Sequence, residues 1–580
     1  MRLLALLLAI AAPLLIAMPL PPIVTMSNQL LAILGWGVVM LVAPAPALQP
    51  ATLRAVAPLL AVFAMAAIGC AASIAAGGMP SPPGIGVLGI LLLGAAVTLH
   101  GTSAGAADPV AFLRPFTIVL VFAGVVGALT AVLQIFAPDL LPVKIVVPPN
   151  LPGRASGNIG QSNHLADHIL WGLIALVPLA RAWRADAPRT RVTHAARAGW
   201  AAAALVMILG LVLSGSRMAL IALLFMALWG ALDRRLSGSV RIGLLASPVA
   251  WGLMLWVTGW WIAHYTHLGL SLTDRGNAGV TAYRADIWRA TLMLIRDQPW
   301  LGVGWGEFNF AWSLTPLSIE ARAGGLMDNT HNLPLQLAVE LGVPAALVMM
   351  GLLLWALGWA MRRVGRLPGE VGVGAQGMLL IVLAMGVHSM FEYPLWYSYL
   401  LLPTAWAFGL ALGAATRAGA PAEPADAPAP PLRAWRALGL MMTVLAASAC
   451  LDYFNIVSLF RPRADSAPLE ERIRSAQASP LFSNQGDLVA IMEHRATAEE
   501  LPLIQRSSRI LVTSRLLFVW SNLLQDQGQT DKARFLAARM REFNLVGARD
   551  WFDVCNDPAV AIKPFQCLPP EHPVSWRDFR

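Results

Sequence analysis

Long runs of apolar residues, separated by short polar stretches, make up most of the chain. An α-helix needs about 20 consecutive apolar residues to cross a hydrocarbon core about 30 Å thick. The pattern therefore predicts an all-α polytopic membrane protein with about thirteen transmembrane helices. The expected spans are residues 3–20, 28–46, 55–76, 84–100, 115–137, 165–180, 199–214, 217–232, 242–262, 333–360, 375–391, 396–415 and 437–457.

The composition supports this class and excludes an ordinary soluble protein. Hydrophobic residues make up 57% of the chain and charged residues only 13%, whereas soluble domains average about 25% charged residues. The net charge of +9 comes almost entirely from arginine in short clusters between apolar runs. Such clusters are typical of membrane topology signals, so the lipid bilayer is expected as a partner and nucleic acid is not.

The arginine clusters also predict an orientation. The first run follows Arg2 and ends without a small-residue cleavage site, so we expect a retained first helix that starts in the cytoplasm. Most arginines between the spans then fall on the cytoplasmic side. Three regions are left on the opposite side, periplasmic in a cell with two membranes, and function is expected there. These regions are residues 138–164, a large loop at 263–332 and a C-terminal domain at 458–580.

The spans between these regions complete the predicted domain organisation. Three groups of transmembrane helices are expected, and an Ala/Pro-rich cytoplasmic linker should precede the last helix. The expected ranges are 1–137, 165–262 and 333–415 for the three groups, 416–436 for the linker and 437–457 for the last helix.

The polar C-terminal domain is predicted to be helical and to carry a disulfide. Residues 507–542 resemble one tetratricopeptide-like hairpin, with a turn at 528–530 and Ala533, Phe535, Leu536 and Met540 on one helical face. Cys555 and Cys567 enclose a short segment of this domain. We expect them to be bridged because disulfides persist outside the cytoplasm.

Arg217 stands against the topology rule, in a very short Ser214-Gly215-Ser216-Arg217 turn on the arginine-poor side. One interpretation is an arginine that extends to the membrane interface. The other is an anion site, in which the turn amides and the start of the next helix reinforce the guanidinium. Phosphate would be its natural ligand.

The large loop contains an arginine-rich amphipathic segment. Ile287, Trp288, Thr291, Leu292 and Ile295 recur at helical spacing, so residues 283–296 can lie along the membrane surface as a helix. Arg284 belongs to this segment and is either part of an interfacial anchor or a binding group. The glycine-rich stretch at 299–308 is not a dinucleotide fingerprint, because no strand precedes it. It predicts a tight loop that approaches another backbone closely.

His331 lies in Asp328-Asn329-Thr330-His331-Asn332, directly before a long apolar run. The histidine could be structural, since Thr330 or Asn332 would cap the following helix without it. At the outer mouth of a membrane domain, however, a neutral imidazole could also accept a proton from an attacking hydroxyl.

Two further polar stretches border the spans. Gln161 and His164 follow turn-forming glycines, with Asn163 as the expected N-cap, and both could hydrogen-bond a polar substrate. His388 and Glu392 are four residues apart, should share a helical face and are further candidates for substrate binding. A metal site is not expected, because no further ligand occurs at a recognisable spacing.

Taken together, these stretches resemble the O-antigen ligase superfamily, and most closely the bacterial O-linking protein oligosaccharyltransferases of the PglL type. The resemblance covers about residues 150–415 and is fairly specific in the order of its motifs. The motifs are GNIGQSNH at 157–164, SGSR at 214–217, YRADIWRATLMLIRDQPWLGVGWGEF at 283–308, DNTHN at 328–332 with the Glu340-Leu341-Gly342 that follows, and HSMFEYP at 388–394.

The resemblance implies an enzyme of the bacterial inner membrane whose active site faces the periplasm. Its donor would be an oligosaccharide on undecaprenyl pyrophosphate, and its acceptor a Ser/Thr hydroxyl of a periplasmic protein such as a pilin. Arg217 and Arg284 would bind the pyrophosphate, His331 would be catalytic, and Gln161 and Tyr393 would belong to the same site.

No cofactor is expected, and scattered acidic residues in the outer loops favour a metal-free reaction. The alternatives are an O-antigen ligase acting on lipid A core, a glycan polymerase, a scaffolding protein and a transporter of lipid-linked glycan. A transporter would show ionisable residues in mid-span and repeated halves, which the sequence lacks.

Overall fold

The computed structural model describes eight stretches of the chain, and helices make up nearly all of their regular structure. Within these stretches the extended backbone is limited to one isolated bridge between Leu151 and Arg154. The expected all-α class is confirmed. The described stretches are residues 1–47, 49–186, 194–265, 279–316, 325–418, 432–493, 501–543 and 548–580.

The α-helices that precede the C-terminal region have the following bounds: α1 Arg2–Leu6, continued by a π-turn and α2 Ala12–Leu15, α3 Met26–Val42, α4 Pro50–Ala75, α5 Ser81–Ala107, α6 Pro109–Phe136, α7 Ser162–Asp186, α8 His194–Ser214, α9 Met218–Leu232, α10 Gly238–Tyr265, α12 Gly279–Asp297, α13 Phe308–Ser313, α14 Leu333–Leu341, α15 Val343–Val364, α16 Gly369–His388, α17 Ser398–Thr416 and α18 Leu432–Phe460. The C-terminal region holds α19 Leu469–Gln477, α20 Ser483–Glu493, α21 Leu501–Ser508, α22 Ser514–Asp526, α23 Thr530–Glu542 and α24 Arg549–Asn556.

Ten of these helices, within the described residues, are long and apolar enough to cross a membrane, which confirms a multi-pass membrane protein. Three further expected spans correspond to the shorter apolar helices Arg2–Leu15, Met26–Val42 and Met218–Leu232. The full count of thirteen and the orientation therefore remain predictions. Most of the Ala/Pro-rich linker, and parts of the large loop at 263–332, lie outside the described residues.

The expected single span at 333–360 is wrong, because the chain breaks at Gly342. This glycine has a φ of 84°, a conformation that costs side-chain-bearing residues free energy. A Cβ there would collide with the carbonyl oxygen of Trp300. Val343 donates its N–H to Pro299 at 2.8 Å, so the glycine-rich loop lies between α14 and α15. The predicted close backbone approach of that loop is confirmed.

Small residues bring α5 and α17 into close contact. Gly101 and Gly105 of α5 lie against the backbone of α17, and Gly409 and Gly413 of α17 lie against the backbone of α5. Spacing of small residues by four positions allows helices to approach closely in a membrane, where packing rather than the hydrophobic effect drives association. Together with α7 and α16, α17 is among the most buried candidate spans.

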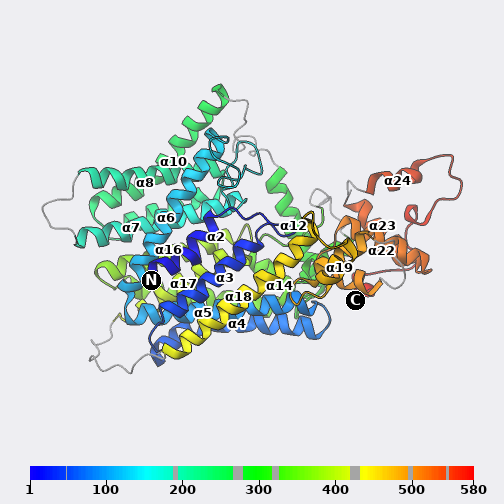
Figure 1. Ribbon diagram of the computed structural model, residues 1–580, viewed down its shortest axis with the longest axis horizontal. Coiled ribbons are helices and arrows are strands. Elements are labelled where there is room, and N and C mark those ends of the chain that lie inside the picture. Colours follow the sequence, from blue (N-terminus) through cyan, green and yellow to red (C-terminus); the bar gives the residue numbers. More distant parts are fainter. Residues whose placement is uncertain are drawn as a thin grey trace.

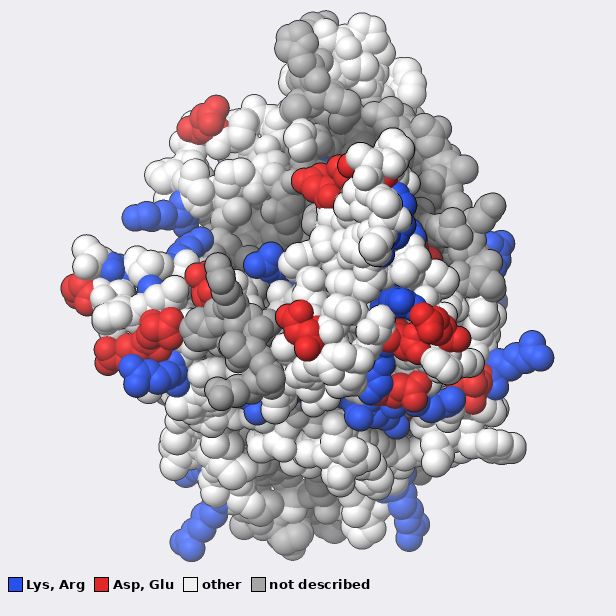
Figure 2. All heavy atoms as spheres, turned by 90° about the vertical axis from the view of Figure 1, so that its right-hand side faces the viewer, with Lys and Arg blue, Asp and Glu red and all other residues white. Residues whose placement is uncertain are grey.

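The C-terminal region, which we call the tail (residues 458–580), lies at one end of the bundle (Figure 1). Its helices α19 and α20 pack beside α18 through Tyr453 and Phe482, whose ring centroids are 5.3 Å apart. The hairpin of α22 and α23 packs instead in one hydrophobic cluster with α12, α13 and α14. Acidic and basic side chains are intermixed on this face of the molecule (Figure 2).

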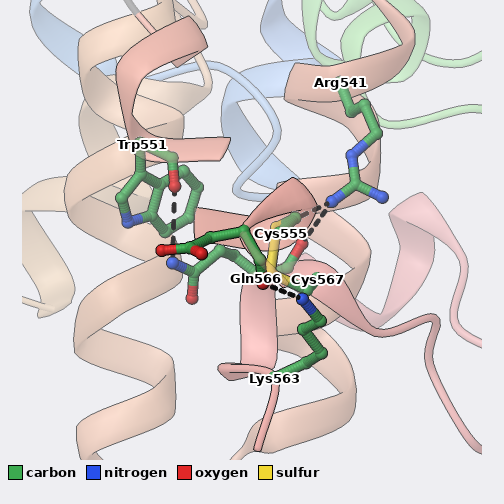
Figure 3. The surroundings of a disulfide bond; sticks show 7 residues. Arg541, Trp551, Cys555, Lys563, Gln566 and Cys567 are labelled. Atoms are coloured by element: carbon green, nitrogen blue, oxygen red, sulfur yellow. Dashed lines mark hydrogen bonds between the residues drawn. A yellow bond between two sulfur atoms is a disulfide. The ribbon is translucent and has the colours of Figure 1, made fainter. Parts of the chain in front are cut away.

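The predicted hairpin is confirmed as α22 and α23, with Gly528 in the turn at a φ of 73°. The four residues expected on one face of the second helix are all buried. Beyond the hairpin, Cys555 and Cys567 form a disulfide (Figure 3). Arg541 of α23 donates to the Gln566 carbonyl at 2.9 Å and so joins the bridged segment to the hairpin.

Candidate active site at the ends of the buried helices

The candidate site forms where three of the most buried helices end. α7 begins at Ser162, α16 ends at His388, and α17 begins at Ser398. The loop that contains His331 joins them, since Leu333 donates its N–H to the Ser389 carbonyl at 2.7 Å. Helices held rigidly by packing thus position a set of loop side chains, an arrangement typical of functional sites.

His331 is held in an unusual backbone conformation at the start of α14. Its φ is 53°, in the left-handed region that non-glycine residues seldom occupy. Its N–H donates to Asn329 Oδ1 at 2.7 Å. Asn332, one of the two expected caps, caps α14 by accepting from the Leu335 N–H at 3.0 Å, and it donates to the Met390 carbonyl. The capping role therefore belongs to Asn332, and the imidazole is left for another role.

Glu392 connects the predicted site residues. Its Oε2 lies 2.9 Å from His331 Nδ1. Its Oε1 is paired with Arg284 and also accepts from Asn163 Nδ2 at 3.3 Å. Burial alone would raise the pKa of Glu392, but the hydrogen bond and charge of His331, with the charge of Arg284, outweigh it and lower that pKa. The side chain is therefore an ionised acceptor at neutral pH.

Arg284 reaches this carboxylate from α12, the helix predicted from the periodicity of residues 283–296. The helix is confirmed, and Ile287, Thr291 and Ile295 of its expected face are buried. Ala290 and Leu294 are buried beside them, whereas Leu292 is 53% exposed. The buried face packs in the same cluster as the tail hairpin, so α12 is attached to protein rather than only to a membrane surface. Trp288 donates to the Thr330 carbonyl at 3.0 Å and ties α12 to the His331 loop.

The start of α7 differs from expectation. Gln161, not Asn163, caps the helix, because Gln161 Oε1 accepts the N–H groups of Asn163 and His164. Asn163 instead bridges two charged side chains. Its Oδ1 accepts from Arg154 at 3.1 Å, while its amide nitrogen donates to Glu392.

Arg154 is a basic residue that sequence reasoning missed. Its Nε donates to the Ser214 carbonyl at 2.8 Å, and its side chain lies against Gly215, which has a φ of 62°. It therefore supports the turn that carries Arg217, which is exposed at the start of α9. The position of Arg154 could have identified it, because residues 138–164 were assigned to the side of the membrane that has few arginines.

Aromatic rings border the histidine. The rings of His331 and Tyr393 lie 5.1 Å apart between centroids, and Tyr393 stacks with Tyr397 at 6.0 Å. Burial raises the pKa of the Tyr393 hydroxyl, which is therefore a neutral hydrogen-bonding group. Tyr393 thus joins His331, Arg284 and Glu392 in one cluster.

His164 and His388 lie deeper and are almost completely buried. His164 Nδ1 is 3.0 Å from the Tyr399 hydroxyl. His388 Nδ1 is 2.9 Å from Asp167 Oδ1, so His388 and Glu392 pair with different side chains although they are only four residues apart. Contact of either histidine with substrate, like that of Gln161, remains a prediction. In the described residues, no group of three or more His, Cys, Asp or Glu side chains could hold a metal ion.

Two protein families and a known relative are similar to parts of this chain. The family described as O-antigen ligase matches residues 202–350, and the C-terminal family of virulence factor membrane-bound polymerases matches residues 376–546. A general O-oligosaccharyltransferase of Acinetobacter baylyi (strain ATCC 33305 / BD413 / ADP1) is 25% identical over 270 residues, which cover 44% of this chain and 43% of the relative. The match thus spans less than half of the length of that relative. The chain therefore resembles the O-antigen ligase superfamily and its PglL-type oligosaccharyltransferases, as the motifs predicted.

Proposed function

We propose that this protein is a metal-independent O-oligosaccharyltransferase of the bacterial inner membrane. It transfers an oligosaccharide from undecaprenyl pyrophosphate to Ser/Thr hydroxyls of periplasmic proteins such as pilins. The observation that carries the proposal is the contact of His331 with Glu392, which also pairs with Arg284. The similarity to a general O-oligosaccharyltransferase supports a protein acceptor.

His331 acts on the acceptor hydroxyl. The Glu392 carboxylate can only accept hydrogen bonds, so the proton between the two lies on Nδ1 and leaves Nε2 as the ring nitrogen available to a hydroxyl. The hydroxyl oxygen forms a bond to the anomeric carbon of the sugar as its proton passes to Nε2. The nearby carboxylate stabilises the resulting imidazolium.

The arginines act on the leaving group. The bond from the anomeric carbon to the phosphate oxygen breaks, and its electron pair remains on the lipid pyrophosphate. Arg217 and Arg284 neutralise this charge, and a guanidinium offers several N–H donors to phosphate oxygens. Arg284 uses one nitrogen for Glu392, which leaves its other donors for phosphate.

The experiment is transfer in a purified system. Wild-type protein and a His331→Ala variant are incubated with undecaprenyl-pyrophosphate oligosaccharide and either a pilin-like protein or lipid A core. We expect glycosylated protein with the wild type and none with the variant. Normal transfer by His331→Ala at equal protein abundance would refute the catalytic role.

A glycan polymerase is the second candidate, because the polymerase family matches residues 376–546. Both activities would use the same arginines and histidine and would differ only in the acceptor. Extension of the lipid-linked glycan in the absence of acceptor protein would favour the polymerase.

A further inference from the structure

Two buried polar side chains connect the His331 loop to the glycine-rich loop along α14. Gln336 is 2% exposed and Glu340 is 5% exposed. Gln336 Nε2 donates to Glu340 Oε1 at 3.0 Å, one helical turn away. Burying polar groups costs free energy unless they are hydrogen-bonded, and apolar residues would pack this face of a helix more simply. We therefore expect the Gln336–Glu340 pair to have a role other than packing.

One end of the pair holds the peptide that precedes His331. Gln336 Oε1 accepts a hydrogen bond from the Thr330 N–H at 2.8 Å, in fully buried surroundings. Among the described residues, His331 is the only non-glycine residue with a φ in the left-handed region. Such a conformation is strained and persists only where the surrounding structure fixes it. Gln336 is one of the groups that fix it.

The other end is anchored in the glycine-rich loop. Glu340 accepts backbone hydrogen bonds from Gly306 and Phe308 as well as the bond from Gln336. Glu340 lies on α14, which is not one of the candidate membrane spans. Burial raises the pKa of Glu340 to about 7, and these N–H donors oppose that rise. The Thr330 N–H can only donate, so it faces the Gln336 oxygen, and the NH₂ group of Gln336 is then directed toward Glu340.

The tail fixes the loop to which Glu340 is anchored. Glu307, between the two donating residues, is 1% exposed. Its Oε2 accepts from Arg580 at 2.8 Å and from Arg509 at 3.4 Å. Arg580 also donates to the Val303 carbonyl at 2.6 Å. A continuous series of hydrogen bonds therefore extends from the tail, through the loop and the pair on α14, to the backbone of the His331 loop.

We propose that Gln336 and Glu340 are positioning residues that set the orientation of His331 through the Thr330 N–H. The inference rests on the proposed function, in which His331 receives the acceptor proton. Neither side chain contacts the reacting groups. Their loss should therefore lower the rate of the chemical step and leave donor binding unchanged.

Gln336→Leu tests the proposal, because it removes the acceptor for Thr330 and leaves a similar volume. A catalytic group misplaced by about 1 Å can lose on the order of 10²-fold in rate. We expect kcat for transfer to fall at least about tenfold and KM for the lipid-linked donor to change less than about threefold. Gln477→Leu is the matched control, because Gln477 also pairs with a carboxylate, Asp487, but in α19 of the tail.

The double variant Gln336→Glu with Glu340→Gln is the rescue. It keeps an oxygen for Thr330, one N–H···O bond between the side chains and an oxygen for the loop amides. We expect a kcat within about threefold of the wild type. If Gln336→Leu fails to accumulate in membranes, the kcat of this double variant still tests the positioning role. A double variant with less than about a tenth of wild-type kcat would overturn the proposal.

His331→Ala separates the two hypotheses. If His331→Ala is inactive while Gln336→Leu keeps wild-type kcat, the positioning role is wrong and the proposed function stands. If His331→Ala is fully active, the proposed function itself fails. An effect of Gln336→Leu confined to KM would also overturn the positioning role, because it would indicate substrate binding instead.

Discussion

Glu392 Oε2 lies 2.9 Å from His331 Nδ1, and the two residues come from loops that are 61 positions apart in sequence. The contact selects the ring nitrogen that carries the proton, because an ionised carboxylate accepts but does not donate. The same carboxylate pairs with Arg284. Glu392 thus links the residue proposed to handle the acceptor proton with one proposed to hold the leaving group.

Glu392→Gln should lower kcat by about 10–10³-fold, because an amide cannot stabilise an imidazolium as a carboxylate does. The matched control is Glu370→Gln, which breaks the ion pair of Glu370 with Arg114. We expect the control to keep wild-type transfer in the purified assay. Equal losses in the two variants would mean that general destabilisation, not the contact with His331, explains the effect.

Arg217→Lys should be nearly as damaging as Arg217→Ala if the guanidinium binds pyrophosphate through two parallel hydrogen bonds. An ammonium is a point charge and does not reproduce the planar arrangement of donors. The measurement is the rate of transfer as a function of donor concentration. Full activity of the lysine variant would support the alternative, an arginine that only extends to the membrane interface.

Arg154→Met should weaken binding of the lipid-linked donor at the site. Arg154 donates both to Ser214, next to the Arg217 turn, and to Asn163, which contacts Glu392. Removing it leaves a buried carbonyl without this donor, a cost of about 1–3 kcal/mol. We expect KM for the lipid-linked donor to rise. The control is Arg241→Met, since Arg241 also donates to backbone carbonyls, at 230 and 231, but at the far end of α9. An unchanged KM in Arg154→Met would argue against a supporting role.

The helices could be predicted from sequence because apolar length is a local property. The apolar runs predicted where the helices lie. His331, Arg284 and Glu392 could be identified as site candidates because each lies in a polar stretch of the sequence. The break at Gly342 was missed because the apolar pattern continues through it. Only the approach of the 299–307 loop from elsewhere in the chain makes a glycine with positive φ necessary there.

Partnerships between the site residues were harder to predict. The spacing of His388 and Glu392 indicated a shared face, yet α16 ends at His388 and the two side chains find different partners. Asn163 was expected to cap α7, whereas tertiary contacts give it a bridging role and leave the cap to Gln161. A single sequence carries no information on which of several polar side chains near one another will pair.

Activity should survive incubation with a strong chelator. No ligand set for a divalent ion is recognisable in the sequence around His331, His388 or Glu392, and Glu392 is already occupied by two basic side chains. The measurement is transfer before and after chelation, with magnesium or manganese added back. Loss on chelation with recovery on adding either metal would overturn the metal-free mechanism.

The Cys555–Cys567 bridge provides a test of orientation as well as of stability. Disulfides form and persist outside the cytoplasm, where the tail is predicted to lie. Closing a loop of this length, with a sequence separation of 12, stabilises by about 3 kcal/mol in the chain-entropy model. Cys555→Ser should therefore destabilise the segment around α24 and increase its cleavage by protease.

Thiol labelling in intact membranes checks the same bridge directly. Both cysteines should resist labelling of the tail until a reductant is added. Cys70 is buried among the membrane helices, and a Cys70→Ser/Cys450→Ser background removes the two remaining thiols from the measurement. Labelling of the tail without reductant would place it in a reducing compartment, and the predicted orientation of the whole chain would then be wrong.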